Sequence, residues 1–120
     1  MDDEDTILKV YALLLSKLGH TAVCAISVNA AVSAFKAAQA EGQPFDVVVL
    51  DLNMGEEASG REALAAMRLV DPGIRAILSS GLSAPRMATE CALHGFNTTI
   101  SKPFCAQDIV DAFKRIFSDP

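Results

Sequence analysis

Short apolar runs alternate along the chain with longer segments whose apolar residues recur at helical spacing. The run DVVVL at 46–50 is continuously apolar after its first residue, which predicts a strand buried on both faces. Residues 74–79 predict a second buried strand, and residues 21–26 and 97–101 predict two weaker ones. The pattern therefore indicates four short strands.

The segments between these strands read as helices. Ile7, Tyr11, Leu14 and Leu18 fall on one helical face, which predicts a helix over 5–18. The same reasoning predicts four further helices, at 29–41 with Asn29 as its cap, 61–70, Pro85–His94 and 105–117. Strands and helices in alternation are typical of an α/β protein with a doubly wound parallel sheet.

Three predicted strands end at residues with charged or hydroxyl side chains. Asp51, Ser80 and Lys102 each stand at or just beyond the end of a predicted strand. In open parallel sheets, ligands bind beyond the carboxyl ends of the strands. We therefore expect the carboxylate, the hydroxyl and the ammonium to face one shared crevice.

Composition narrows the class of protein. The 120 residues are 51% hydrophobic and carry a net charge of −5, which fits a single domain over 1–120 and argues against a nucleic-acid surface. No apolar stretch reaches the roughly 18 residues of a membrane span, and the acidic start MDDED is unlike a signal peptide. We expect no nucleic-acid or membrane contact by this domain. The three cysteines lack CxxC spacing and are expected to be small buried hydrophobes.

Acidic residues gather just before the first helix. The cluster Asp2-Asp3-Glu4-Asp5 stands where a further loop at the edge of Asp51 would lie, and Glu4 and Asp5 also suit a helix start stabilised by the dipole. Carboxylates at one edge repel one another unless a cation lies among them, and oxygen ligands favour Mg²⁺. A carboxylate nucleophile, a dication, a hydroxyl and an ammonium together suit a phosphoryl group.

The order of these motifs is similar to that of a known family. DD, VVVLDLNM, AILSSG and SKPF, in this order, resemble the receiver domain of two-component response regulators across the whole chain. The resemblance implies a flavodoxin-like (βα)5 fold that takes a phosphoryl group from a histidine kinase or phosphotransfer domain. It also implies a cytoplasmic location, alone or tethered to a membrane sensor kinase. Such a domain catalyses its own phosphorylation and dephosphorylation without turning over a separate substrate.

The resemblance assigns the phosphoryl chemistry to three residues. Asp51 matches the phosphoacceptor, and Ser80 and Lys102 match the hydroxyl and the ammonium that contact the phosphoryl group. Ser79 stands one residue early and is expected to face away from the crevice. Pro103 matches a proline that follows a cis peptide.

The resemblance also implies a Mg²⁺ site. Asp3, Asp51 and the backbone carbonyl of Asn53 match its direct ligands, and Asp2 matches a ligand that acts through water. Two departures stand out, because Met54-Gly55 replaces the usual Met-Pro and Thr99 replaces an aromatic residue that often couples phosphorylation to output. The loop from Asp51 to Gly60 is also one residue longer than in the commonest receivers. This longer loop, the SSG motif and the GF before the last strand resemble receivers fused to sensor histidine kinases.

A third departure concerns the first strand. Receivers begin with an apolar strand before the acidic pair, inside the sheet between the strands expected at 21–26 and 46–50, and this chain has only Met1 there. Each main-chain group left unpaired by its loss costs about 1–3 kcal/mol, so a monomer with such a gap is not expected to be stable. We expect about five or six apolar, β-branched residues before Met1 in the natural protein. Donation of a strand by another chain, or direct pairing of the two neighbours, is the alternative.

Other functions fit the residues less well. A phosphatase of the haloacid dehalogenase type needs a second aspartate where this chain has Asn53. A flavodoxin-like flavin binder needs a phosphate-binding loop where this chain has DDEDT. The remaining alternative is a receiver-like interaction module that takes no phosphate.

Overall fold

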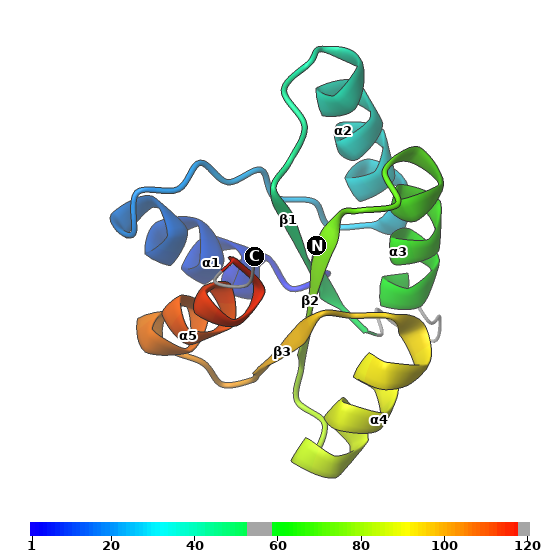
Figure 1. The fold of residues 1–120 in the computed structure, drawn as a ribbon. Helices are drawn as coiled ribbons and strands as arrows, with labels where there is room; N and C mark the ends of the chain where they lie inside the picture. Colours follow the sequence, from blue (N-terminus) through cyan, green and yellow to red (C-terminus); the bar gives the residue numbers. More distant parts are fainter. Residues whose placement is uncertain (53–58, 118–120) are drawn as a thin grey trace.

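The computed structural model describes residues 1–52 and 59–117, which form a three-layer α/β fold (Figure 1). Along the chain the elements are α1 (Asp5–Lys17), α2 (Val28–Ala40), β1 (Val47–Asp51), α3 (Ser59–Val70), β2 (Arg75–Ser80), α4 (Ala84–His94), β3 (Thr98–Ser101) and α5 (Ala106–Phe117). Each of these elements was predicted from the sequence, with bounds that agree within two residues.

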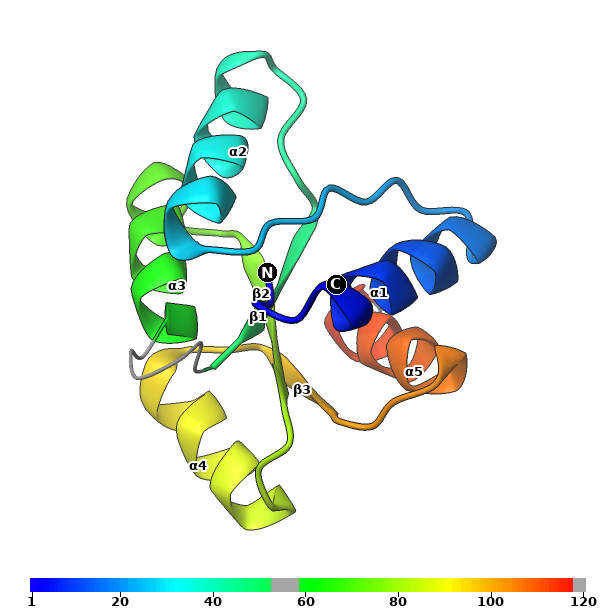
Figure 2. The same cartoon turned by 180° about the vertical axis from the view of Figure 1, so that it is seen from behind.

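The three described strands form one parallel sheet in the order β1-β2-β3. Helices α1 and α5 cover one face of the sheet, and α2, α3 and α4 cover the other (Figures 1 and 2). The predicted α/β fold with a doubly wound parallel sheet is therefore confirmed. In this register Asp51 lies opposite Ser79, and Ser80 lies opposite Ser101. The polar strand ends thus meet at one edge.

Two apolar clusters hold the layers together. The cluster under α1 and α5 contains Tyr11, Ile77, Ile100, Ile109, Ala112 and Ile116. The cluster under α2, α3 and α4 is built around Phe35, Leu50, Leu64, Met67, Leu78 and Met87. The middle strand β2 contributes alternate residues to both clusters, because successive side chains of a strand point to opposite faces.

Local signals explain several helix ends. Pro85 lies in the first turn of α4, and Gly95 ends that helix in the left-handed region at a φ of 78°, as the sequence predicted. The prediction of Asn29 as the cap of α2 was wrong. Ser27 is the cap, because its side chain accepts a hydrogen bond from the amide of Ala30 at 3.1 Å.

The predicted strand at 21–26 is absent from the structure. Residues 20–25 have no regular secondary structure; His20 N donates to Leu15 O at 2.9 Å, and Ala25 O accepts a hydrogen bond from Asp2 N at 3.1 Å. Val23 and Ile26 are 61% and 63% exposed. A strand forms only where a neighbouring strand pairs with it. In the described part of the chain, no strand lies beside this segment. The apolar sequence alone was therefore insufficient to predict a strand at 21–26.

The cysteine prediction also needs correction. Cys24 and Cys105 are exposed, and only Cys91 is partly buried. Cys24 belongs to the segment that did not become a strand, and Cys105 directly precedes α5. An apolar neighbourhood in the sequence did not imply burial at these two positions.

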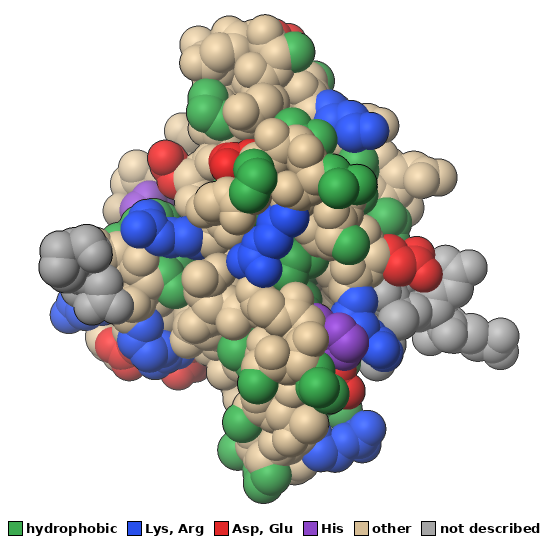
Figure 3. Space-filling view, turned by 45° about the vertical axis from the view of Figure 1, so that its right-hand side comes forward, with side chains coloured by type: hydrophobic (Ala, Val, Ile, Leu, Met, Phe, Trp, Pro, Cys, Tyr) green, Lys and Arg blue, Asp and Glu red, His purple; other side chains and the backbone are tan. Residues whose placement is uncertain are grey.

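The molecular surface is mixed in character. On the face shown in Figure 3, Lys and Arg side chains lie singly among apolar and acidic ones. None of the helices in the described ranges is long and apolar enough to cross a membrane.

Gly60 fixes how closely α3 approaches the end of β1. Its N–H donates to Leu52 O at 2.9 Å, and a Cβ atom there would meet the carbonyl oxygen of Asp51 and lie 2.9 Å from Leu52 Cα. Both obstacles are backbone atoms, which cannot move aside as a flexible side chain can. The absence of a side chain at Gly60 therefore helps to place Asp51.

We expect Gly60→Ala to lower the free energy of unfolding by about 1–3 kcal/mol, the usual cost of overpacking. Alanine would otherwise stabilise a helix relative to glycine, so a loss identifies the steric contact as its cause. Gly81→Ala is the matched control, because a Cβ there meets no atom within 4 Å. Urea unfolding measures both variants, and equal stability of the two would contradict this role of Gly60.

Candidate functional site

The ammonium of Lys102 lies between two carboxylates from distant parts of the chain. Its Nζ is 2.6 Å from Asp2 Oδ2 and 3.6 Å from Asp51 Oδ1. Asp2 and Asp51 are both buried. The structure thus brings together three of the residues that the sequence predicted to share a crevice.

Main-chain bonds hold these groups at the edge of the sheet. Asp51 is the last residue of β1, and its N–H donates to Met1 O at 3.0 Å. Lys102 directly follows β3, and its N–H donates to Ser80 O at 2.8 Å. The peptide between Lys102 and Pro103 is cis, as the resemblance implied.

Three successive carboxylates form an oxygen-rich cluster beside this ion pair. Carboxylate oxygens of Asp2, Asp3 and Glu4 all lie within 4.8 Å of one another. Asp2 is buried and its Oδ1 accepts from Glu4 N at 3.0 Å, whereas Asp3 and Glu4 are exposed. The sequence predicted Glu4 both as part of the acidic cluster and as a helix start. It is the N-cap residue of α1, but its side chain makes no capping hydrogen bond, and its carboxylate lies in the cluster.

The structure describes the positions of Ser80 and Thr99 but not that of Asn53. Ser80 is buried at the end of β2, and its Oγ accepts from Leu82 N at 3.3 Å in the loop before α4. Among the described residues, no hydrogen bond joins Ser80 to Asp51. Asn53 and the neighbouring Met54-Gly55 lie outside the described residues. Thr99 is part of β3, where its carbonyl accepts from the Arg115 side chain at 3.0 Å.

Tyr11 of α1 contacts Ser79, the residue before Ser80. It was not identified from the sequence as part of the site. Its hydroxyl lies 2.6 Å from Ser79 Oγ, and its ring stacks on Phe104 at 4.2 Å between centroids. Ser79 therefore points toward α1, which agrees with the expectation that it faces away from the crevice. Burial raises the pKa of Tyr11, so its hydroxyl stays protonated. Helical periodicity shows that Tyr11 is buried but not what its hydroxyl contacts.

The charges of the crevice shift two pKa values. Burial raises the pKa of Asp51 from 3.8 to about 6; the ammonium of Lys102 opposes the shift, and the carboxylates of Asp2 and Asp3 add to it. Burial alone would lower the pKa of Lys102, but its hydrogen bond to Asp2 and the charge of Asp51 outweigh burial and raise it. Burial is thus the largest cause of the raised pKa of Asp51, and two buried carboxylates, Asp2 and Asp51, lie near the one ammonium of Lys102.

We expect Asp51→Asn to stabilise the fold without metal. The unfolded chain gives up the Asp51 proton near pH 4 and the folded chain near pH 6, so wild-type stability falls as pH rises through that window. Lys102 keeps Asp2 as its partner in the variant. The gain should be near zero at pH 4 and roughly 1–2 kcal/mol above pH 6, allowing for screening by water.

Urea unfolding in EDTA at pH 4 and pH 7.5 measures this gain. Asp5→Asn, which removes an exposed carboxylate, is the control and should show no comparable gain. A destabilised Asp51→Asn variant at pH 7.5 would contradict the charge balance described for the crevice.

Comparison with known proteins identifies the family. The sequence model of the response regulator receiver domain matches residues 1–114. The chain is 33% identical over 112 residues to the alginate biosynthesis transcriptional regulatory protein AlgB of Pseudomonas putida, covering 90% of this chain and 22% of that protein. It is also 33% identical over 70 residues to the chemotaxis protein CheY of Listeria monocytogenes, covering 58% of each. The chain thus spans about a fifth of the length of AlgB.

Solved structures agree with this assignment. A response regulator receiver domain protein from Clostridium thermocellum shares 26% identity at a TM-score of 0.78, with 98% of this chain and 90% of that one covered. The chemotaxis protein CheY4 of Vibrio cholerae shares the fold at a TM-score of 0.80 and 22% identity, with 97% and 93% covered. The family match over nearly the whole chain and the common fold lead to one conclusion: this chain belongs to the response regulator receiver domain family of two-component signalling.

Proposed function

We propose that this receiver domain accepts a phosphoryl group on Asp51 from the phosphohistidine of a histidine kinase or phosphotransfer domain. One observation carries the proposal. The Lys102 ammonium lies within 3.6 Å of Asp51 at the carboxyl edge of the sheet, beside the carboxylate cluster at Asp2, Asp3 and Glu4. This is the combination of nucleophile and charge that phosphoryl transfer to a carboxylate needs.

The transfer balances as a simple displacement. An oxygen of the Asp51 carboxylate forms a bond to phosphorus as the phosphorus–nitrogen bond of the phosphohistidine breaks. The imidazole keeps the electron pair of that bond and takes up a proton. Lys102 then turns from Asp2 toward the phosphoryl oxygens and neutralises their charge. Water later attacks phosphorus, which releases inorganic phosphate and restores the carboxylate.

The residues at this edge fit a hard divalent cation. Their donor atoms are all oxygens, three carboxylates lie within 4.8 Å of one another, and the buried Asp51 carboxylate lies near the same ammonium as Asp2. Asp3 and Asp51 would hold Mg²⁺ directly, with the Asn53 carbonyl, and Asp2 would act through water. When bound, Mg²⁺ supplies positive charge for the phosphoryl oxygens.

Signalling would follow from the contacts of Ser80. Its hydroxyl holds the amide of Leu82, so a phosphoryl group on Asp51 that attracts this hydroxyl would pull on the loop before α4. Thr99 replaces the aromatic residue that often couples phosphorylation to output in this family. The output would therefore leave through α4 and its loop toward a partner protein.

The direct test is incubation with acetyl phosphate and Mg²⁺ followed by intact mass. We expect wild-type protein to gain the mass of one phosphoryl group and Asp51→Asn to gain none, because an amide is no nucleophile for this transfer. Asp46→Asn is the matched control, since this exposed residue precedes the opposite end of β1. Wild-type protein that stays unmodified would support the inert interaction module instead.

Lys102→Ala should separate the phosphorylation of Asp51 from the conformational change that follows it. We expect the variant to accept phosphoryl from acetyl phosphate more slowly, because it loses the ammonium beside Asp51. Phosphorylation should then change the amide chemical shifts of 81–83 less than in wild-type protein. Two-dimensional NMR measures these shifts. Changes as large as in the wild type would rule out a coupling role for Lys102.

Asp3→Ala should weaken Mg²⁺ binding by at least about tenfold, because open carboxylate sites depend on ligand charge. Asp5→Ala is the control. It also removes one acidic residue, but its side chain pairs with Lys9 on α1 at 2.9 Å. Calorimetric titration of both variants with MgCl₂ measures the difference. Equal affinities would show that Asp3 is not a ligand.

A further inference from the structure

Two hydroxyl groups meet inside an otherwise apolar cluster, and the proposed chemistry uses neither of them. The Tyr11 hydroxyl lies 2.6 Å from Ser79 Oγ, and both side chains are buried. The other buried members of the cluster under α1 and α5 are Ile77, Ile100, Ile109, Ala112 and Ile116. A buried pair of hydroxyls adds only modestly to stability relative to apolar groups of the same shape. Packing alone therefore gives no reason for a tyrosine and a serine here.

Ser79 lies at the centre of the edge that carries the site. In the sheet it is opposite Asp51 on one side and opposite Ile100 on the other. It directly precedes Ser80, whose carbonyl accepts from the Lys102 amide at 2.8 Å. A hydrogen bond that holds the Ser79 side chain therefore also holds the strand end between the proposed phosphoacceptor and the ammonium.

The same tyrosine contacts the segment that follows Lys102. Its ring stacks on Phe104 at 4.2 Å between centroids, with 26° between the ring planes. Phe104 comes shortly after Lys102, which itself follows β3 directly. Tyr11 thus contacts both segments that bear a phosphoryl-binding residue, the end of β2 and the residues after β3.

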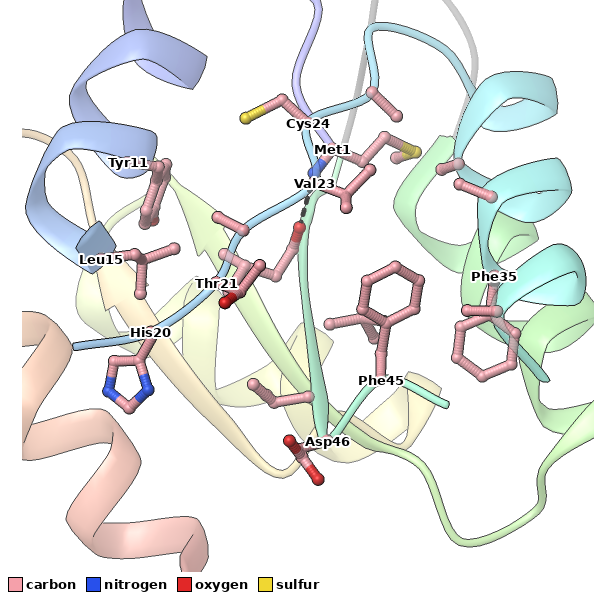
Figure 4. A pocket seen from close by; sticks show the side chains of 18 of the residues that line it. Met1, Tyr11, Leu15, His20, Thr21, Val23, Cys24, Phe35, Phe45 and Asp46 are labelled. Atoms are coloured by element: carbon pink, nitrogen blue, oxygen red, sulfur yellow. Dashed lines mark hydrogen bonds between the residues drawn. The ribbon is translucent and has the colours of Figure 1, made fainter. Parts of the chain in front are cut away.

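Tyr11 also lines a pocket beside β1, where it projects from α1 toward the sheet (Figure 4). Residues 47–49 line the same pocket and are only partly buried, although the sequence predicted a strand buried on both faces. Ser79 and Phe104 are not among the residues that line it. The contacts of Tyr11 with these two residues therefore do not depend on what the pocket holds.

The helix that carries Tyr11 begins directly after the acidic cluster at residues 2–4. Within this cluster Asp2 pairs with Lys102 at 2.6 Å. Contacts that fix α1 against the sheet thus also bear on the acidic partner of the ammonium. Three parts of the site meet around one side chain of α1.

We propose that Tyr11 is a positioning residue, in a role that rests on the phosphoryl transfer to Asp51 proposed above. It holds the ends of β2 and β3 at a fixed spacing, and this spacing places the Lys102 ammonium beside the Asp51 carboxylate. Reacting groups need such support from side chains that are themselves fixed by packing and hydrogen bonds. In the described part of the chain, no hydrogen bond joins Tyr11 to Asp51 or Lys102. Tyr11 therefore acts through Ser79 and Phe104.

Three variants and a control separate positioning from structural support. Tyr11→Phe and Ser79→Ala each leave one hydroxyl unpaired, and Tyr11→Phe keeps the ring that stacks on Phe104. The double variant leaves neither hydroxyl, so its free energy of unfolding should be close to that of the wild type. Thr98→Val is the matched control. It removes another buried hydroxyl of the same sheet, which accepts from the Arg115 side chain at 2.7 Å.

Two measurements compare these chains. With acetyl phosphate and Mg²⁺, we expect the double variant to gain the phosphoryl group about tenfold more slowly than the wild type, because misplaced groups react slowly. Thr98→Val should react at the wild-type rate. Without phosphorylation, exchange of the Lys102 amide hydrogen reports its bond to Ser80. We expect this exchange to speed up by about tenfold in the double variant and to change less in the control.

The positioning role would be overturned by a double variant that reacts at the wild-type rate, whether or not its Lys102 amide exchanges faster. If the double variant does not fold, Tyr11→Phe decides by the same two measurements. Wild-type protein that gains no phosphoryl group would instead overturn the proposed function. Exchange at Lys102 would then still show whether Tyr11 fixes this part of the site, and unchanged exchange in the double variant would overturn that separately.

Discussion

The ion pair of Lys102 with Asp2, and its close approach to Asp51, is the interaction on which the site depends. It joins the end of β3, the first residues and the end of β1, which lie far apart in the sequence. Two buried carboxylates and one ammonium leave a net negative charge. Burial, and to a smaller extent the carboxylates of Asp2 and Asp3, raise the pKa of Asp51. A bound hard cation, or a phosphoryl group together with its own counterion, would offset this net negative charge. The same imbalance thus favours both parts of the proposed chemistry.

The sheet supplies the positions that this charge balance requires. Asp51 and Lys102 project from the ends of strands whose register is fixed by β2 between them. The acidic residues do not lie on a strand. Main-chain bonds of Met1 to β1 link them to the sheet, and Asp2 N also donates to Ala25 O. In this way the sheet and the acidic residues are physically connected.

Much of this arrangement could be predicted from the sequence, for identifiable reasons. The continuous apolar run at 46–50 and the helical spacing of Ile7 and Tyr11 report burial directly, and strand ends in a parallel sheet must meet at one edge. The prediction at 21–26 was wrong because a strand needs a neighbour, which a single-segment pattern does not show. The contact of Tyr11 with Ser79 and the close packing at Gly60 depend on tertiary geometry, and propensity carries no signal for them.

The most direct test of phosphoryl transfer to Asp51 is to locate the phosphoryl group chemically. Borohydride reduces an acyl phosphate at an aspartate side chain to the alcohol, which leaves a stable mark at that residue. After treatment with acetyl phosphate and Mg²⁺, reduction and digestion, peptide mass spectrometry should find homoserine at position 51. Homoserine at Asp2, Asp3 or Asp46 with an unmodified Asp51, or none in the chain, would contradict the assignment of Asp51 as phosphoacceptor.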